Sequence, residues 1–152
     1  MSLEIETVLA PVDGSDASAT AAEYAVEVAA RYGADVHALF VLAEDVPGGT
    51  DAGAVDGPSD RDEDDLRPEH RAFLDDVRAV GGDRVAVTAA SIHGFSTRRK
   101  TQHPGNVILG ATDDVGADFI VVPRESEDAD DTTLEKVAEY VLLYASQPVL
   151  SV

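Results

Sequence analysis

Two short segments of the chain combine polar residues with the positions that a ligand site would need. The segment Asp13–Ser15 directly follows the apolar run Val8–Val12, and a polar segment, 123–136, follows the apolar run Phe119–Val122. A protein that binds phosphate between a strand and a helix places glycines there, because the backbone must approach the anion and the helix start supplies amides. The second segment instead carries acid, at Glu125, Glu127, Asp128, Asp130 and Asp131.

A cluster of basic residues lies in the segment before Pro104. It contains Arg98, Arg99, Lys100 and His103, and so holds three of the chain's 11 Lys and Arg residues. One interpretation is a site for an anion or an acidic partner. The other is a counter-charge for the acidic run Asp60–Asp65 within the same chain. We prefer the second, because charge clusters are usually solvated surface features.

No group of residues suits a metal or a covalent reaction. The absence of cysteine excludes thiol catalysis and cysteine metal sites. The four histidines lack zinc-ligand spacing, and Asp60–Asp65 lacks the glycine and terminal glutamate of a calcium loop. Neither Ser15 nor Ser18 lies in the Gly-x-Ser-x-Gly pattern of a nucleophile elbow. We therefore expect no catalytic residue, no metal and no enzyme activity.

Apolar runs alternate with helical patterns along the chain. The runs are short and continuous, which is typical of strands buried on both faces. Residues 43–65, rich in glycine and acid, predict a flexible acidic loop within a single domain spanning 1–152. The pattern as a whole predicts an α/β fold, an open parallel five-stranded sheet with helices on both faces. Its strands are expected at Val8–Val12, Val36–Leu42, Arg84–Ile92, Phe119–Val122 and Val149–Val152.

The helices between these strands have recognisable start signals. Pro68 and Pro104 suit first helical turns, and Thr132 with Glu135 forms a capping-box signal for the last helix. The segment Gly94–His103 is expected to be a polar loop. Apolar residues recur at helical spacing and include Tyr24, Tyr32 and Val115, and Leu142 is expected on the buried face of the last helix.

The net charge restricts the partners that the chain can bind. It is −19, from 30 Asp and Glu against 11 Lys and Arg, and nucleic-acid binding requires a basic face instead. No apolar run approaches the roughly 18 residues of a membrane span. The acidic start Met1–Glu6 is unlike a signal peptide, so we expect a cytoplasmic protein. The acidic, lysine-poor composition resembles that of proteins from salt-accumulating halophiles.

The order of these pieces resembles that of the universal stress protein family. The resemblance lies in the first strand with Asp13–Ser15, in Gly33–Val36, in Ala117–Val122 and in Glu139–Val152. It implies the strand order 3-2-1-4-5, with nearly the whole chain in a Rossmann-like fold similar to that of adenine nucleotide alpha hydrolases. It also implies a homodimer formed through the last strand, Val149, Leu150, Ser151 and Val152. An apolar edge strand with little charge fits such pairing.

The resemblance implies a nucleotide site that this chain only partly preserves. In the family, ATP lies against a loop of three spaced glycines followed by Ser or Thr. Here Pro123 and Ser126 occupy the first two glycine positions, and Glu135-Lys136 falls on the last glycine and its neighbour. The residues that would remain for a nucleotide are Asp13, Gly14, Ser15 and Val41. The alternative is that Asp13 caps the first helix and Gly14 makes the turn.

The preferred interpretation is a dimeric, non-enzymatic module for stress response or regulation, with a degenerate ATP loop and no expected cofactor. The resemblance would otherwise make ATP the cofactor. A second interpretation is a stress protein that binds ATP or AMP through Asp13 and backbone amides. A third is a weak nucleotide hydrolase or an adenylating enzyme.

We expect the stability of the folded chain to increase with salt. In dilute buffer the excess acidic charges repel one another within a small domain, whereas molar KCl screens them. The melting temperature should therefore rise with KCl concentration, as measured by circular dichroism. A melting temperature that does not change with KCl would contradict this interpretation of the composition.

Overall fold

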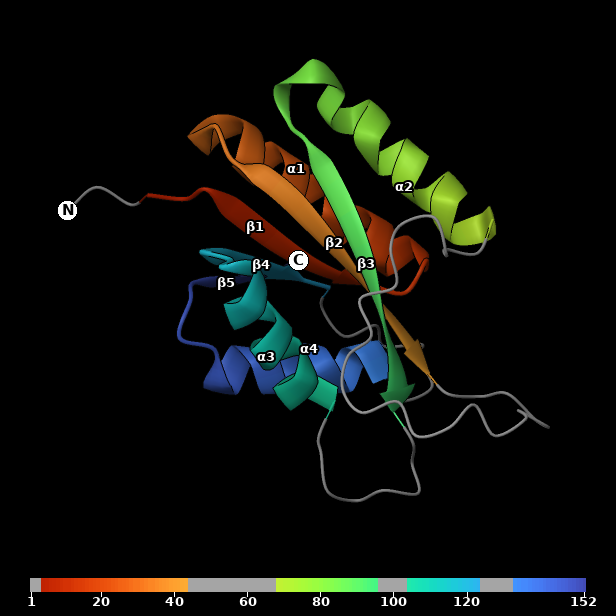
Figure 1. Cartoon of the computed structure of the whole chain (residues 1–152), viewed down its shortest axis with the longest axis vertical. Coiled ribbons are helices and arrows are strands. Elements are labelled where there is room, and N and C mark those ends of the chain that lie inside the picture. Colours follow the sequence, from red (N-terminus) through yellow and green to blue (C-terminus); the bar gives the residue numbers. More distant parts are fainter. Residues whose placement is uncertain (1–3, 44–67, 96–103, 124–132) are drawn as a thin grey trace.

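Within the described residues, five parallel strands form one open sheet in the computed structural model of the chain (Figure 1). The structure describes residues 4–43, 68–95, 104–123 and 133–152. Nearly all of the expected acidic loop 43–65 lies outside these ranges, as does Thr132, the expected cap of the last helix.

The central strand has a neighbour on each side. β1 (Thr7–Val12) pairs with β2 (Asp35–Ala43) and with β4 (Phe119–Val122). β3 (Val87–Phe95) extends the sheet beyond β2, and β5 (Val149–Ser151) extends it beyond β4. The order β3-β2-β1-β4-β5 confirms the predicted fold class and the strand order that the resemblance implies.

Helices cover both faces of the sheet (Figure 1). α1 (Asp16–Tyr32) and α2 (Pro68–Gly81) lie on one face, and α3 (Pro104–Val115) and α4 (Thr133–Tyr144) lie on the other. A short 3-10 helix, η2 (Gly82–Arg84), joins α2 to β3. Pro68 and Pro104 begin their helices, as predicted. None of the helices in the described part of the chain is long and apolar enough to span a membrane.

The sheet separates two apolar cores. Side chains of a strand alternate between its faces, so Val8, Ala10 and Val12 join the core under α1 and α2. Leu9, between them, joins the core under α3 and α4, with Ile108 and Ile120 among its neighbours. This burial on both faces explains why the strand sequences are continuously apolar rather than alternating.

α1 packs on the sheet through small side chains. Ala21, Ala22, Ala25 and Ala29 are fully buried, which lets the helix lie close to β1. The helix ends at Gly33, which adopts the left-handed conformation with φ 65° and donates its N–H to the carbonyl of Ala29. Such a glycine satisfies a helix-end carbonyl without the steric cost that a Cβ would bring.

β3 differs from its predicted range at both ends. It begins at Val87 rather than Arg84, because Gly82, with φ 56°, first turns the chain into η2. It continues to Phe95, because pairing with β2 resumes after an irregularity and places Ala43 opposite Phe95. Gly94 therefore lies in a strand, and its assignment to a polar loop was wrong.

Leu142, which was predicted to be buried, is exposed, and so are three other apolar residues at helical spacing. The sheet-facing side of α1 is filled by alanines, and that of α4 by Ala138 and Val141, so larger neighbours lie off these faces. Burial of a helical residue depends on which neighbours flank the helix as well as on its spacing. The four exposed residues are Tyr24, Tyr32, Val115 and Leu142.

Candidate functional site

The carboxyl ends of β1 and β4 form the place where a ligand would bind in this topology. The chain leaves β1 toward β2 on one side, and β4 occupies the other side, so strand order reverses here. Ligands of open parallel α/β sheets bind at such a reversal. Asp13, Gly14 and Ser15 follow β1, and the buried Pro123 follows β4. The structure therefore brings Asp13–Ser15 and Pro123, the first residue of the second predicted segment, to the same edge.

The turn after β1 is held by its own polar groups. The Ser15 N–H donates to Oδ1 of Asp13 at 2.9 Å, which makes a local turn around Gly14, whose φ is 84°. Ser15 then adopts an extended conformation, and its Oγ accepts the N–H of Ser18 at 3.2 Å. Ser15 is therefore the cap of α1. The alternative that Asp13 caps this helix is wrong, because the glycine turn shifts the cap two residues later.

Ser18 closes the same turn from inside α1. Its hydroxyl donates to the carbonyl of Ser15 at 2.9 Å and accepts the N–H of Asp13 at 3.4 Å. The N–H of Ala19 bonds the carbonyl of Ser15 at 2.9 Å. Asp16 places a carboxylate in the first turn of α1, where it complements the positive end of the helix. The N–H groups of Asp13, Ser15 and Ser18 therefore have partners within this turn.

A histidine that sequence reasoning did not assign to this edge lies directly beneath the turn. His70 of α2 is 6% exposed, and its ring stacks on Phe40 of β2 with centroids 4.7 Å apart. Its Cδ2 is 3.6 Å from the position that a Cβ on Gly14 would occupy. The helical spacing of His70 with Phe73, Leu74 and Val77 is the sequence signal that predicts its burial.

Val41 lies at the same edge but in the sheet interior. Val12 pairs with Phe40, so Val41 follows at the level of Asp13 on the neighbouring strand. Its side chain is buried in the core under α3 and α4, with Leu39 and Ile108. Asp13 is half-buried. The structure thus brings together the four residues that the resemblance implies for a nucleotide, without showing a ligand role for any of them.

Other predicted site residues fall elsewhere. Arg98, Arg99, Lys100 and His103 lie outside the described residues, so the basic cluster stays a prediction. Glu135 and Lys136 lie in the first turn of α4. Among the residues that the structure describes, no group of three or more His, Asp or Glu side chains could hold a metal ion. Nδ1 of His37 lies 2.8 Å from Oγ1 of Thr88, across the β2–β3 pair.

The last strand lies at the sheet edge, as expected. β5 has β4 as its only neighbour in the described sheet, and the residues from Val149 to Val152 are half-buried. Two backbone bonds define its orientation: the Ile120 N–H donates to the Pro148 carbonyl, and the Val152 N–H donates to the Val122 carbonyl. Because this alternation continues along a parallel strand, the backbone groups of Val149 and Ser151 point away from the sheet.

The fold and the site define a class of protein: an open, parallel, Rossmann-like α/β domain with its ligand edge at the β1–β4 reversal. The chain belongs to the universal stress protein family, whose model matches residues 4–152. No curated protein matches the chain.

Solved structures of family members share the fold. A universal stress family protein from Burkholderia pseudomallei is 25% identical with TM-score 0.64, covering 97% of this chain and 96% of that one. A universal stress protein in complex with cAMP is 20% identical with TM-score 0.61, covering 98% and 97%. One from Archaeoglobus fulgidus in complex with dAMP is 20% identical with TM-score 0.55, covering 99% and 98%.

The same substitution at two glycines should have opposite effects. Gly14→Ala forces a Cβ into the left-handed region and toward His70, so it should lower the free energy of unfolding by about 1 kcal/mol or more. Gly110→Ala, within α3 and with no atom within 4 Å of the new Cβ, should raise it by roughly 0.5 to 1 kcal/mol. Urea unfolding in molar KCl measures both. An increase in stability for Gly14→Ala would contradict the turn geometry described above.

Proposed function

We propose that this acidic chain is a non-enzymatic module for stress response or regulation, which acts as a homodimer in a salt-rich cytoplasm. We further propose that it does not bind ATP through the phosphate loop of its family. The observation that carries this proposal is the buried Pro123 at the end of β4, in the position of the first glycine of that loop.

The residues after β4 support the same conclusion. Pro123 has no N–H to offer a phosphate, and it is buried at the strand end. Glu135 lies in the first turn of α4, where a phosphate would otherwise meet the positive end of the helix. Two like charges 4 Å apart repel by about 1 kcal/mol even in water, and the sequence places five more carboxylates between these residues.

A second function is a module that binds a nucleotide through Asp13 and backbone amides. Two relatives of the same fold were solved with cAMP and dAMP, which each carry a single phosphate. A ligand with one phosphate needs fewer donors than ATP, and the half-buried Asp13 at the strand reversal is the acid that would meet its nucleoside end. The third candidate, a weak hydrolase or adenylating enzyme, has no nucleophile and base that can be named.

Calorimetric titration with Mg-ATP, AMP, cAMP and dAMP in molar KCl tests these functions. We expect no heat of binding from Mg-ATP, because the segment after β4 carries Pro123 and carboxylates in place of the glycines of the family's loop. Micromolar affinity for Mg-ATP would overturn the proposal. Binding of the monophosphates without ATP would favour the second function.

Asp13→Asn is the matched variant for this titration. It keeps an oxygen that can accept the Ser15 N–H, so the turn should fold as before. It removes the charge that would meet the nucleoside end of the ligand, so any affinity for a monophosphate should fall. An affinity that does not change would exclude Asp13 from the site.

The proposed dimer forms through the outer edge of β5. The outward N–H and C=O groups of Val149 and Ser151 have no neighbouring strand in the described sheet, and an unpaired apolar edge is a template for another strand. A two-fold arrangement would pair β5 with β5 of a second copy, because closed two-fold dimers use the same surface on both subunits.

Ser151→Pro tests this edge without touching the β4 ladder. Proline removes an N–H that points outward and leaves the bond from Val152 to Val122 in place. The dissociation constant of the dimer should rise about tenfold or more, because a bond is lost on each side of the axis. Sedimentation velocity in molar KCl measures it, with Ser151→Ala as control. A dimer of unchanged affinity in Ser151→Pro would exclude pairing through β5.

A further inference from the structure

The solvent side of α4 carries two tyrosines and a leucine near the end of the helix. Leu143 is 69% exposed and Tyr144 is 64% exposed, whereas Val141, in the same turn, is fully buried. The ring of Tyr140 lies against that of Tyr144, with centroids 4.6 Å apart and planes tilted by 45°. Side chains three and four residues apart are neighbours on a helix. Tyr140, Leu143 and Tyr144 therefore form one continuous surface, which we call the α4 outer face.

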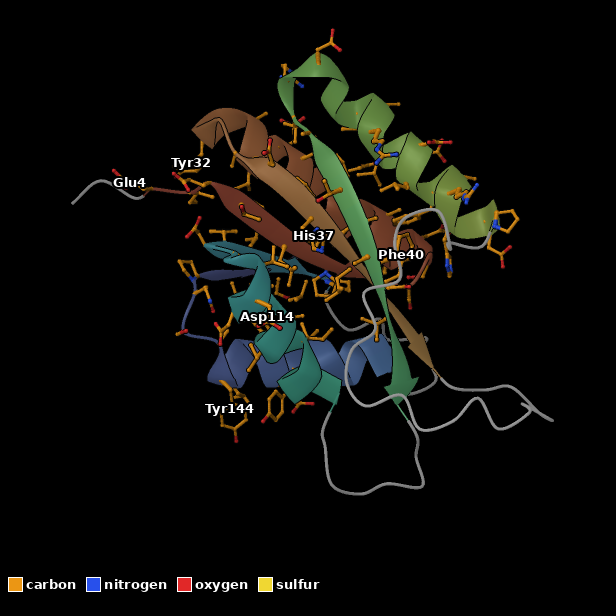
Figure 2. All side chains as sticks on the ribbon, in the orientation of Figure 1. Glu4, Tyr32, His37, Phe40, Asp114 and Tyr144 are labelled. Atoms are coloured by element: carbon orange, nitrogen blue, oxygen red, sulfur yellow. The ribbon has the colours of Figure 1, made fainter. Side chains whose placement is uncertain are left out.

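The α4 outer face points away from the sheet and from the β5 edge. Ala138 and Val141 face the sheet. Successive residues of a helix point about 100° apart, so Leu143 points away from the sheet. Because α4 connects β4 to β5 in a right-handed crossover, the two tyrosines lie on the flank toward α3, and the opposite flank lies toward β5. Figure 2 shows the labelled Tyr144 projecting away from the sheet.

The last turn of α3 brings acidic groups beside this surface. Nε2 of Gln147 donates to Oδ1 of Asp113 at 3.4 Å, which ties the chain after α4 to the end of α3. Asp113 and Asp114 are exposed, and so is Glu139 on α4. Both helices run antiparallel to the strands, so their C-terminal ends, which carry partial negative charge, lie at the same edge of the sheet. The apolar surface is thus bordered by negative charge.

Neither of these two helices ends with a basic residue that would offset this charge. α1 and α2 have Arg31 and Arg78 in their last turns, whereas the last turns of α3 and α4 contain no basic residue. A cation beside a helix C-terminus is stabilising, most of all where the negative end is otherwise uncompensated. The border of the α4 outer face is therefore suited to cations that a partner supplies.

We propose that the α4 outer face binds a segment of another protein in which apolar side chains are flanked by arginines. This goes beyond the regulatory module proposed above, because it names the kind of partner that such a module would bind. Apolar side chains of the segment would cover Leu143 and the tyrosine rings. Guanidinium groups would stack on the exposed ring of Tyr144 and pair with Asp113 and Asp114. The apolar contacts would persist in molar salt, whereas screening would leave only the charges in direct contact.

The negative border argues against other occupants of an apolar surface. In a two-fold contact between copies of this chain, each border would face an identical one, and like charges would meet. A lipid or nucleic-acid surface carries phosphates, which the same carboxylates repel. The dimer proposed at β5 lies beyond the opposite flank of α4, so it would leave the outer face exposed. A basic, apolar protein segment is the occupant that both the rings and the border favour.

A helical peptide with leucines on one side and arginines on the other is a direct probe of this surface. Fluorescence anisotropy of the labelled peptide measures its binding in molar KCl, which screens long-range attraction to the −19 chain. We expect saturable binding to the wild-type chain. Binding should be about tenfold weaker or more when glutamate replaces arginine, or when serine replaces leucine. A lack of saturable binding, or equal binding of the arginine and glutamate peptides, would overturn the proposal.

Tyr144→Ala and Tyr32→Ala form a matched pair of variants. Both remove an exposed tyrosine ring, but Tyr32 is at the end of α1, on the opposite face of the sheet. The dissociation constant of the arginine peptide should rise about fivefold or more for Tyr144→Ala and stay unchanged for Tyr32→Ala. Far-UV circular dichroism checks that both variants remain folded. Equal effects of the two variants would show that the peptide does not distinguish the α4 outer face.

Two pairs of acidic residues test whether the border acts locally. Asp113→Asn combined with Asp114→Asn removes two charges beside the face and keeps an oxygen that can accept the bond from Gln147. Asp75→Asn combined with Asp76→Asn removes two charges from an exposed pair on α2. The first combination should weaken binding of the arginine peptide about threefold or more, and the second should not change it. If both weaken it equally, the peptide responds only to net charge and the proposal is wrong.

Sedimentation velocity separates this surface from the dimer edge. Tyr144→Ala should leave the dissociation constant of the dimer unchanged, and Ser151→Pro should leave the affinity for the arginine peptide unchanged. A dimer weakened by Tyr144→Ala would identify a second copy as the occupant and overturn the proposal. A wild-type chain that binds the peptide as a monomer would support the α4 outer face and contradict only the dimer proposed at β5.

Discussion

The parallel pairing of β1 on both sides is the constraint on which the rest of the structure depends. A central strand has both edges bonded and both faces covered, so its side chains must be apolar and must fit two cores at once. Val8, Ala10 and Val12 fill one core, and Leu9 fills the other. The same pairing ends at Val12, and so it places the glycine turn at the strand reversal. The position of this six-residue strand therefore determines both how the two cores are filled and where the candidate site lies.

Much of this arrangement could be predicted from the sequence, because buried parallel strands leave a strong apolar signal. The runs at β1 and β4 and the prolines that begin α2 and α3 needed no structure to be found. Details that depend on one backbone angle were missed. The cap moved from Asp13 to Ser15 because Gly14 takes a positive φ, and β3 began late because Gly82 does the same. A sequence shows a glycine but not the sign of its φ.

The burial of residues on the flank of a helix was also predicted wrongly, but for a different reason. Leu142 and Tyr24 have the spacing of buried residues, yet both are exposed. His70 has the same kind of spacing and is buried, because Phe40 and the turn at Gly14 lie against it. Periodicity gives the direction of a side chain, whereas burial requires a neighbour in that direction. Only the layer order of the fold supplies that neighbour, and at the β5 edge the described chain supplies none.

β4 connects the ligand edge of the sheet with its outer edge at β5, the two regions on which the proposed functions depend. Val122, its last residue, is followed by Pro123 at the ligand edge and is paired with Ser151 at the sheet edge. The carboxyl end of β5 thus reaches the same rim as the turn after β1, while the exposed end of α4 lies at the opposite end of the strands. An association through β5 would hold the short β4 from its outer side, away from Asp13 at the end of β1. The ligand edge and the association surface can therefore act independently, although a single four-residue strand positions both.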